Sequence, residues 1–109
     1  MNRVEVLTYT ALIYVGGDWR KAERIARAFC DEVGLCVTVE ALRYVYTDGA
    51  CGGVRVGLIN YARFNAEPRT IFAKAERLAR LLIDGLGQES ASIVATDKTV
   101  WLSNRGADA

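Results

Sequence analysis

The sequence contains no histidine among its 109 residues. Histidine is the commonest general base near neutral pH, the usual activator of a serine or cysteine nucleophile, and the commonest transition-metal ligand. Any catalysis would therefore depend on carboxylates, Cys, Tyr, Lys or Arg, which lowers the prior for an enzyme without removing it. No pair of carboxylates is marked as a general acid and base, so we assign no catalytic residue and expect no cofactor.

Cysteine is also scarce, with Cys30, Cys36 and Cys51 as the three instances. An odd number argues against a disulfide framework, and the spacing matches no zinc-binding pattern. We therefore predict no metal site. Cys51 lies in a glycine-rich segment and is the thiol whose reactivity would be worth testing.

Long apolar runs and an excess of one charge are absent too. No run approaches the roughly 18 residues of a membrane span, and residues 1–5 lack the pattern of a signal peptide. The formal charge is +1, from 14 basic and 13 acidic residues, whereas nucleic-acid-binding domains usually carry a basic excess. We expect a cytoplasmic protein with neither a membrane nor a nucleic acid as partner.

Apolar residues make up 51% of the chain, enough for one packed core. Their spacing predicts strands over 4–14, 36–46 and 54–61 and helices over 19–33 and 70–86. The alternation changes phase in the first strand, which indicates either a bulge near Val6-Leu7 or burial on both faces. Residues 47–53 are predicted as a turn and 62–69 as a loop. Residues 92–95 start a fourth strand, and 99–102 either continue it or return as a hairpin.

This element order is that of the ferredoxin-like βαββαβ arrangement. It predicts an α+β two-layer sandwich, with one antiparallel sheet and both helices on one face, in a single domain over residues 1–103. Residues 104–109 are polar and are expected to fray. Right-handed crossovers place the first and third strands side by side in the middle of the sheet.

The predicted strands are longer than the predicted helices. Eleven-residue strands reach roughly 36 Å, and a sixteen-residue helix reaches roughly 24 Å. The uncovered sheet must therefore meet something apolar, and another subunit is the simplest candidate. We expect a homo-oligomer.

Large aromatic side chains on the strands and a polar loop supply the candidate binding residues. Strand parity could gather the aromatics on the uncovered face as a ligand pocket or interface, although ordinary packing beneath the helices is the alternative. The loop over 60–69 could hold an anion beside a helix start, or could be a plain polar connector. The candidate ligand-binding residues are Tyr9, Tyr44, Tyr46, Asn60, Arg63 and Trp101.

Three stretches carry a resemblance to known proteins: YVGGD over 14–18, FCDEVGLCVT over 29–38 and VGLINY over 56–61. Together with TVWLS over 99–103, they resemble small bacterial proteins carried on mobile elements, including products of integron gene cassettes. The resemblance implies a compact, often oligomeric accessory protein. It implies no particular activity, and no functional residue is carried over from it.

Three functional hypotheses follow. The leading one is a non-catalytic binding module that self-associates through its sheet and holds a small ligand near the aromatic face. The second is a small histidine-free enzyme of the dimeric α/β-barrel kind, with a cavity enclosed between paired sheets. The third is a protein-interaction adaptor.

Overall fold

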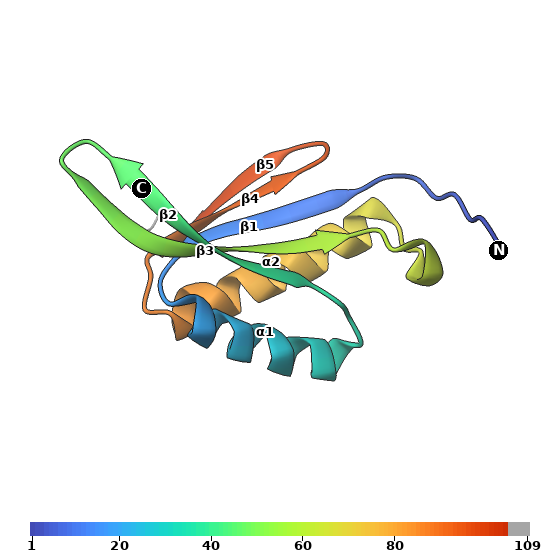
Figure 1. Ribbon diagram of the computed structural model, residues 1–109, viewed down its shortest axis with the longest axis horizontal. Helices are drawn as coiled ribbons and strands as arrows, with labels where there is room; N and C mark the ends of the chain where they lie inside the picture. Colours follow the sequence, from blue (N-terminus) through green and yellow to red (C-terminus); the bar gives the residue numbers. More distant parts are fainter. Residues whose placement is uncertain (105–109) are drawn as a thin grey trace.

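The computed structural model describes residues 1–104, and the rest of the predicted tail lies outside these residues. The elements follow in the order β1 (Thr10–Gly16), α1 (Trp19–Val33), β2 (Thr38–Tyr46), β3 (Gly49–Ile59), a short 3-10 helix (Ala62–Phe64), α2 (Pro68–Gly85), β4 (Ser90–Ala95) and β5 (Thr99–Ser103). Both helices pack against the same face of the sheet (Figure 1). The predicted α+β two-layer sandwich is confirmed.

The five strands form one antiparallel sheet in the order β2-β3-β1-β4-β5. β1 and β3 are neighbours in its interior, as the crossover rule predicts. Residues 92–95 and 99–102 belong to the two strands of a hairpin rather than to one strand, because β5 turns back and pairs antiparallel with β4. The sheet is the ferredoxin-like one with an additional edge strand.

Helix α1 begins and ends where the sequence predicts. The Asp18 side chain accepts a hydrogen bond from the backbone N–H of Arg20 at 3.1 Å, which satisfies one otherwise free donor of the first turn. Gly34 adopts a left-handed conformation with φ of 69° and donates its N–H to the Cys30 carbonyl. Helix α2 begins earlier than predicted, because Pro68 fits the first turn, where no N–H is needed.

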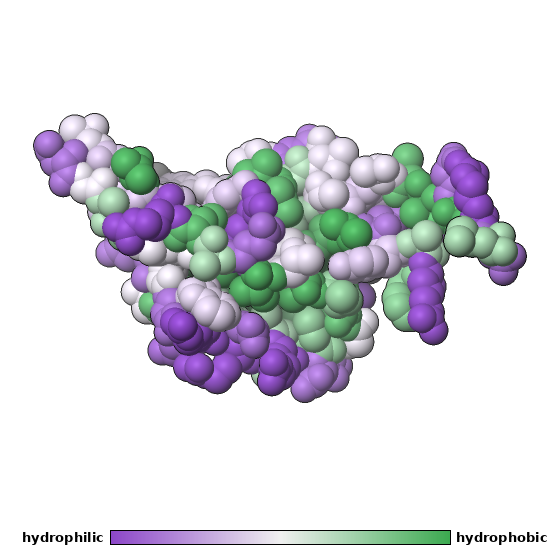
Figure 2. All heavy atoms as spheres, in the orientation of Figure 1, coloured by the Kyte–Doolittle hydropathy of each residue, from purple (hydrophilic) through white to green (hydrophobic). Residues whose placement is uncertain are grey.

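The core lies between the helices and the sheet. Its buried side chains come from alternate positions of the central strands and from one face of each helix: Ala11, Ile13, Val15, Val54, Val56, Leu58, Ile93, Ala22, Phe29, Leu78 and Leu82 are among them. Hydrophilic residues gather over the outer side of α1, which faces away from the sheet (Figure 2). The helical layer thus covers one face of the sheet and leaves the other open.

The two largest differences from the predicted boundaries both concern strand length. The first strand begins at Thr10 rather than Val4, because residues before it have no neighbouring strand, so no bulge forms at Val6-Leu7. The segment 47–53 is not a turn throughout, because β3 already begins at Gly49 and the chain reverses at Thr47-Asp48. The overhanging part of the sheet is therefore the end of the β2–β3 hairpin, beyond the Gly16–Gly53 pair that ends β1.

No helix within residues 1–104 combines the length and the apolar composition that a membrane crossing would need.

Candidate functional site

The uncovered face of the sheet carries one continuous row of paired side chains. Glu40 pairs with Arg55, Arg55 with Tyr14, Tyr14 with Ser92, and Ser92 with Trp101. Partners in a pleated sheet project to the same side. The row therefore crosses all five strands on the side that the helices leave open.

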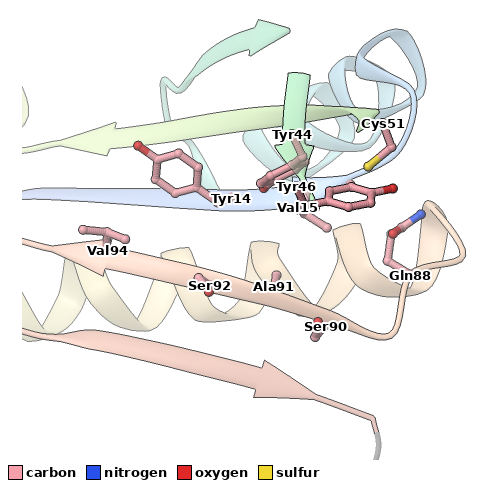
Figure 3. Close-up of a pocket in the computed structure, with 11 residues that line it drawn as sticks. Tyr14, Val15, Tyr44, Tyr46, Cys51, Gln88, Ser90, Ala91, Ser92 and Val94 are labelled. Atoms are coloured by element: carbon pink, nitrogen blue, oxygen red, sulfur yellow. The ribbon is translucent and has the colours of Figure 1, made fainter. Parts of the chain in front are cut away.

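A shallow groove of about 600 Å³ lies beside this row. The overhanging β2–β3 hairpin forms one wall, and β4 with the loop before it forms the other (Figure 3). The lining residues are Tyr14, Val15, Gly16, Tyr44, Tyr46, Cys51, Gln88, Ser90, Ala91, Ser92 and Val94. The groove thus joins side chains that lie far apart in the sequence.

Glycines of β3 beneath the two tyrosine rings allow the rings to lie flat against the hairpin. A Cβ on Gly49 would come 2.5 Å from Cε2 of Tyr46. A Cβ on Gly53 would meet the Tyr44 ring and would come 2.9 Å from the carbonyl oxygen of Val15. The glycine-rich stretch is therefore a strand that makes room for two aromatic rings.

Tyr14 is held from the neighbouring strand by a charged pair. Arg55 makes a bidentate contact with Glu40, at 2.8 and 2.9 Å from its Nη2 atom, and donates from Nη1 to the Tyr14 hydroxyl oxygen at 3.4 Å. The hydrogen bonds to Tyr14 and then to Glu40 raise the pKa of Arg55. Arg55 is therefore permanently charged, and it orients the Tyr14 phenol from beside the groove.

The groove itself is uncharged. None of its eleven lining residues is an Asp, Glu, Lys or Arg. Burial raises the pKa of Tyr44, with a further contribution from Cys51, so its phenol stays protonated. Such a lining suits a flat heterocycle that stacks on tyrosine, a cationic group that lies over a ring face, or both.

Two of the candidate ligand-binding residues, Tyr44 and Tyr46, lie together in this groove. The expected position of Tyr9 on the uncovered face is wrong. Tyr9 is 3% exposed and belongs to the core cluster, because it shares the strand parity of Ala11 and Ile13. Its hydroxyl donates to Asp97 Oδ1 at 2.9 Å and so ties the start of β1 to the β4–β5 turn.

The remaining candidates lie elsewhere. Trp101 is on the uncovered face, 50% exposed, but does not line the groove. The Asn60 side chain donates to the carbonyl of Leu7 and accepts from the backbone N–H of Ala66. This is a structural role at the end of β3. Arg63 is exposed and its guanidinium lies 5.5 Å from the centre of the Phe64 ring.

Sequence reasoning missed part of the groove. Tyr14 alternates with buried Ile13 and Val15, which is a signal that it faces outward. Gln88 and Ser90 carry no local signal, because their position depends on how the loop after α2 returns to the sheet. Across residues 1–104, no cluster of three or more acidic or cysteine side chains is arranged to hold a metal ion.

Neither a protein-family model nor a curated protein matches the sequence. Two solved structures are similar in fold. One is a phage SAM lyase in complex with S-methyl-5'-thioadenosine, with a TM-score of 0.75, 16% sequence identity and 98% of each chain covered. The other is a phage SAM lyase in the apo state, with a TM-score of 0.77, 18% identity and the same coverage. At this identity the likeness shows a shared fold over the whole described chain.

Proposed function

We propose that this chain binds a small sulfur-containing nucleoside, S-adenosylmethionine or S-methyl-5'-thioadenosine, in the tyrosine-lined groove. The observation that carries the proposal is the neutral groove on the uncovered face, with Tyr14, Tyr44 and Tyr46 in its lining. The similar fold of a SAM lyase in complex with S-methyl-5'-thioadenosine supports this class of ligand over others.

The chemistry of the groove suits the two ends of such a ligand. Adenine is a flat aromatic system that stacks on a tyrosine face, and a sulfonium is a cation that an aromatic face attracts. Gln88, Ser90 and Ser92 supply an amide and two hydroxyls for the ribose or the amino-acid end. The volume of about 600 Å³ lies in the usual range for a small-molecule site.

We further propose that a second copy of the chain covers the groove. The same face bears Val94, 38% exposed, and Trp101, 50% exposed. Apolar residues of this size on an uncovered sheet are favoured positions for a protein interface. The variant Trp101→Arg should lower the average mass of the assembly in light scattering, and a wild type that is already a monomer would remove this part of the proposal.

Calorimetric titration with S-adenosylmethionine tests ligand binding. Tyr46→Ala should weaken binding about fivefold or more, since stacking on one aromatic ring contributes about 1–3 kcal/mol. The matched control is Val45→Ala, because Val45 immediately precedes Tyr46 in β2, is 81% exposed and does not line the groove. Equal affinities for the two variants would contradict the proposed site.

A second candidate is an enzyme that cleaves S-adenosylmethionine, because both structurally similar proteins are named lyases. In such a cleavage the bond between the sulfonium sulfur and the methionyl Cγ breaks, and sulfur keeps the electron pair as S-methyl-5'-thioadenosine leaves. In one route the substrate's own carboxylate attacks Cγ as this bond breaks, and a lactone forms. In the other route a water molecule takes a proton from Cβ as the bond breaks, and an alkene forms. Neither route needs a histidine.

Incubation of the protein with S-adenosylmethionine separates the two candidates. Release of S-methyl-5'-thioadenosine above the spontaneous rate, lost in Tyr46→Ala and kept in Val45→Ala, would identify an enzyme. Binding without release would identify a binding module.

A further inference from the structure

Residues 1–8 form an extended arm that leaves the body of the molecule (Figure 1). Val4 is 67% exposed and Leu7 is 72% exposed. Within residues 1–104 the backbone of residues 1–6 has no hydrogen-bond partner. An extended segment with exposed apolar side chains and free backbone edges is suited to pairing with another chain.

The arm is held firmly at its base. The Asn60 side chain donates to the carbonyl of Leu7 at 2.8 Å, and the Asn60 backbone N–H donates to the carbonyl of Tyr9 at 2.9 Å. These two hydrogen bonds fix the base of the arm, so the arm projects from a defined place. The radius of gyration is 14.6 Å, whereas a compact chain of this length has about 13 Å, as expected when segments project from the body.

A second, more apolar pocket of about 350 Å³ lies at the same end of the molecule. It is lined by Gly34, Leu35, Cys36, Ile59, Phe64, Ala66, Ile71 and Lys74. Phe64 is 70% exposed and Ile59 is 42% exposed. Ala66 also lines the depression around Leu7, so the pocket and the base of the arm are adjacent.

We infer that the arm of a second copy of this chain occupies this pocket, and that two copies exchange their arms reciprocally. The arm and the pocket lie at one end of the same chain, as a closed two-fold exchange requires. Val4 and Leu7 supply the apolar groups. Lys74 has no ion-pair partner among residues 1–104 and can meet Glu5 of the incoming arm, whose present partner is the exposed Arg3 at 2.6 Å.

The groove on the sheet takes no part in this exchange, so the inference is independent of the proposed ligand. Eight extended residues span about 26 Å, long enough to cross from one body to the next. The exchange differs from association through the uncovered face, because it joins the molecules at the end where α2 begins.

Disulfide trapping in the full chain tests the exchange, since Cys36 lines the pocket and is exposed. In a Val4→Cys variant under mild oxidation, the introduced thiol should bond Cys36 about tenfold or more in preference to exposed Cys51. Cys51 lines the tyrosine groove and serves as the internal control for random collision. Adding Cys36→Ser should abolish the preferred product.

Mixing isotopically labelled and unlabelled protein before oxidation decides which copy supplies the arm. Cross-linked peptides that combine the two labels support exchange between copies. Cross-links confined to single chains would show that the arm folds onto its own pocket and would overturn the inference, as would equal trapping at Cys36 and Cys51. A Val4→Asp substitution needs no oxidation and can be made in a Trp101→Arg background, where association through the uncovered face is weakened. It should raise the dissociation constant of the dimer about tenfold or more, and an unchanged constant would also overturn the inference.

Discussion

The ring of Tyr44 lies over Gly53, where the two residues sit on neighbouring strands of the overhanging hairpin. A side chain at position 53 would meet both this ring and the backbone carbonyl of Val15. The ring can shift, but the carbonyl belongs to the central strand and cannot. The absence of a side chain at Gly53 is thus what lets Tyr44 form a wall of the groove.

Gly53→Ala should therefore destabilise the protein by about 1–3 kcal/mol, the usual effect of forcing extra atoms into a packed site. Gly52→Ala is the matched control, because a Cβ there meets nothing within 4 Å. Urea unfolding of both variants gives the comparison. Equal stability of the two variants would mean that the Tyr44–Gly53 contact does not constrain the hairpin.

Alkaline pH should reveal the buried phenol of Tyr9. Burial, aided by the hydrogen bond to Asp97, raises the pKa of Tyr9 from 10.0 to about 12. The folded state holds this proton more tightly than the unfolded state, so the stabilisation is fully present below pH 10 and is lost as the pH rises to about 12. The loss should be about 3 kcal/mol, since each pKa unit corresponds to about 1.4 kcal/mol.

A Tyr9→Phe variant isolates this contribution from the other groups that titrate at high pH. It should cost about 1 kcal/mol at neutral pH for the lost hydrogen bond, and its stability should fall less steeply than that of the wild type above pH 10. Parallel alkaline profiles for the two proteins would show that Tyr9 titrates normally in the fold.

Neighbouring leucines on α2 should respond in opposite ways to truncation. Leu82 is fully buried against the sheet, whereas Leu81 is 45% exposed on the outer side. Leu82→Ala should cost about 2–5 kcal/mol, because it leaves a cavity. Leu81→Ala should stay within about 0.5 kcal/mol of the wild type, and a comparable loss in both would place an unrecognised contact on the outer face.

The helices and the layer arrangement could be predicted because their signals are local and periodic. Asp18 and Gly34 bound α1 as expected, and the apolar stripe of α2 corresponds to its buried residues. The ends of strands are harder to predict from the sequence, because a strand ends where the strand that pairs with it ends. Nothing local shows that Val4 lacks a neighbouring strand, and glycines such as Gly53 favour a turn until the tyrosine that covers them is known.

The groove could be predicted only in part. Tyr44 and Tyr46 are large aromatics on one strand face, which is a local pattern. Gln88 joins them from the loop that follows α2, a neighbourhood set by the tertiary fold. The sequence leaves open whether Tyr9 faces the uncovered side or the helices, because aromatic character does not say which of two faces a strand buries.

The most direct test of the central claim is to map, by NMR, the backbone amide shifts that S-methyl-5'-thioadenosine produces in the labelled protein. We predict saturable shifts concentrated in the hairpin around Tyr44 and Cys51, in Tyr14 and over 88–92, with little change near Phe64 and Ile71. Shifts confined to the second pocket, or no shifts at millimolar ligand, would contradict a nucleoside site in the tyrosine-lined groove.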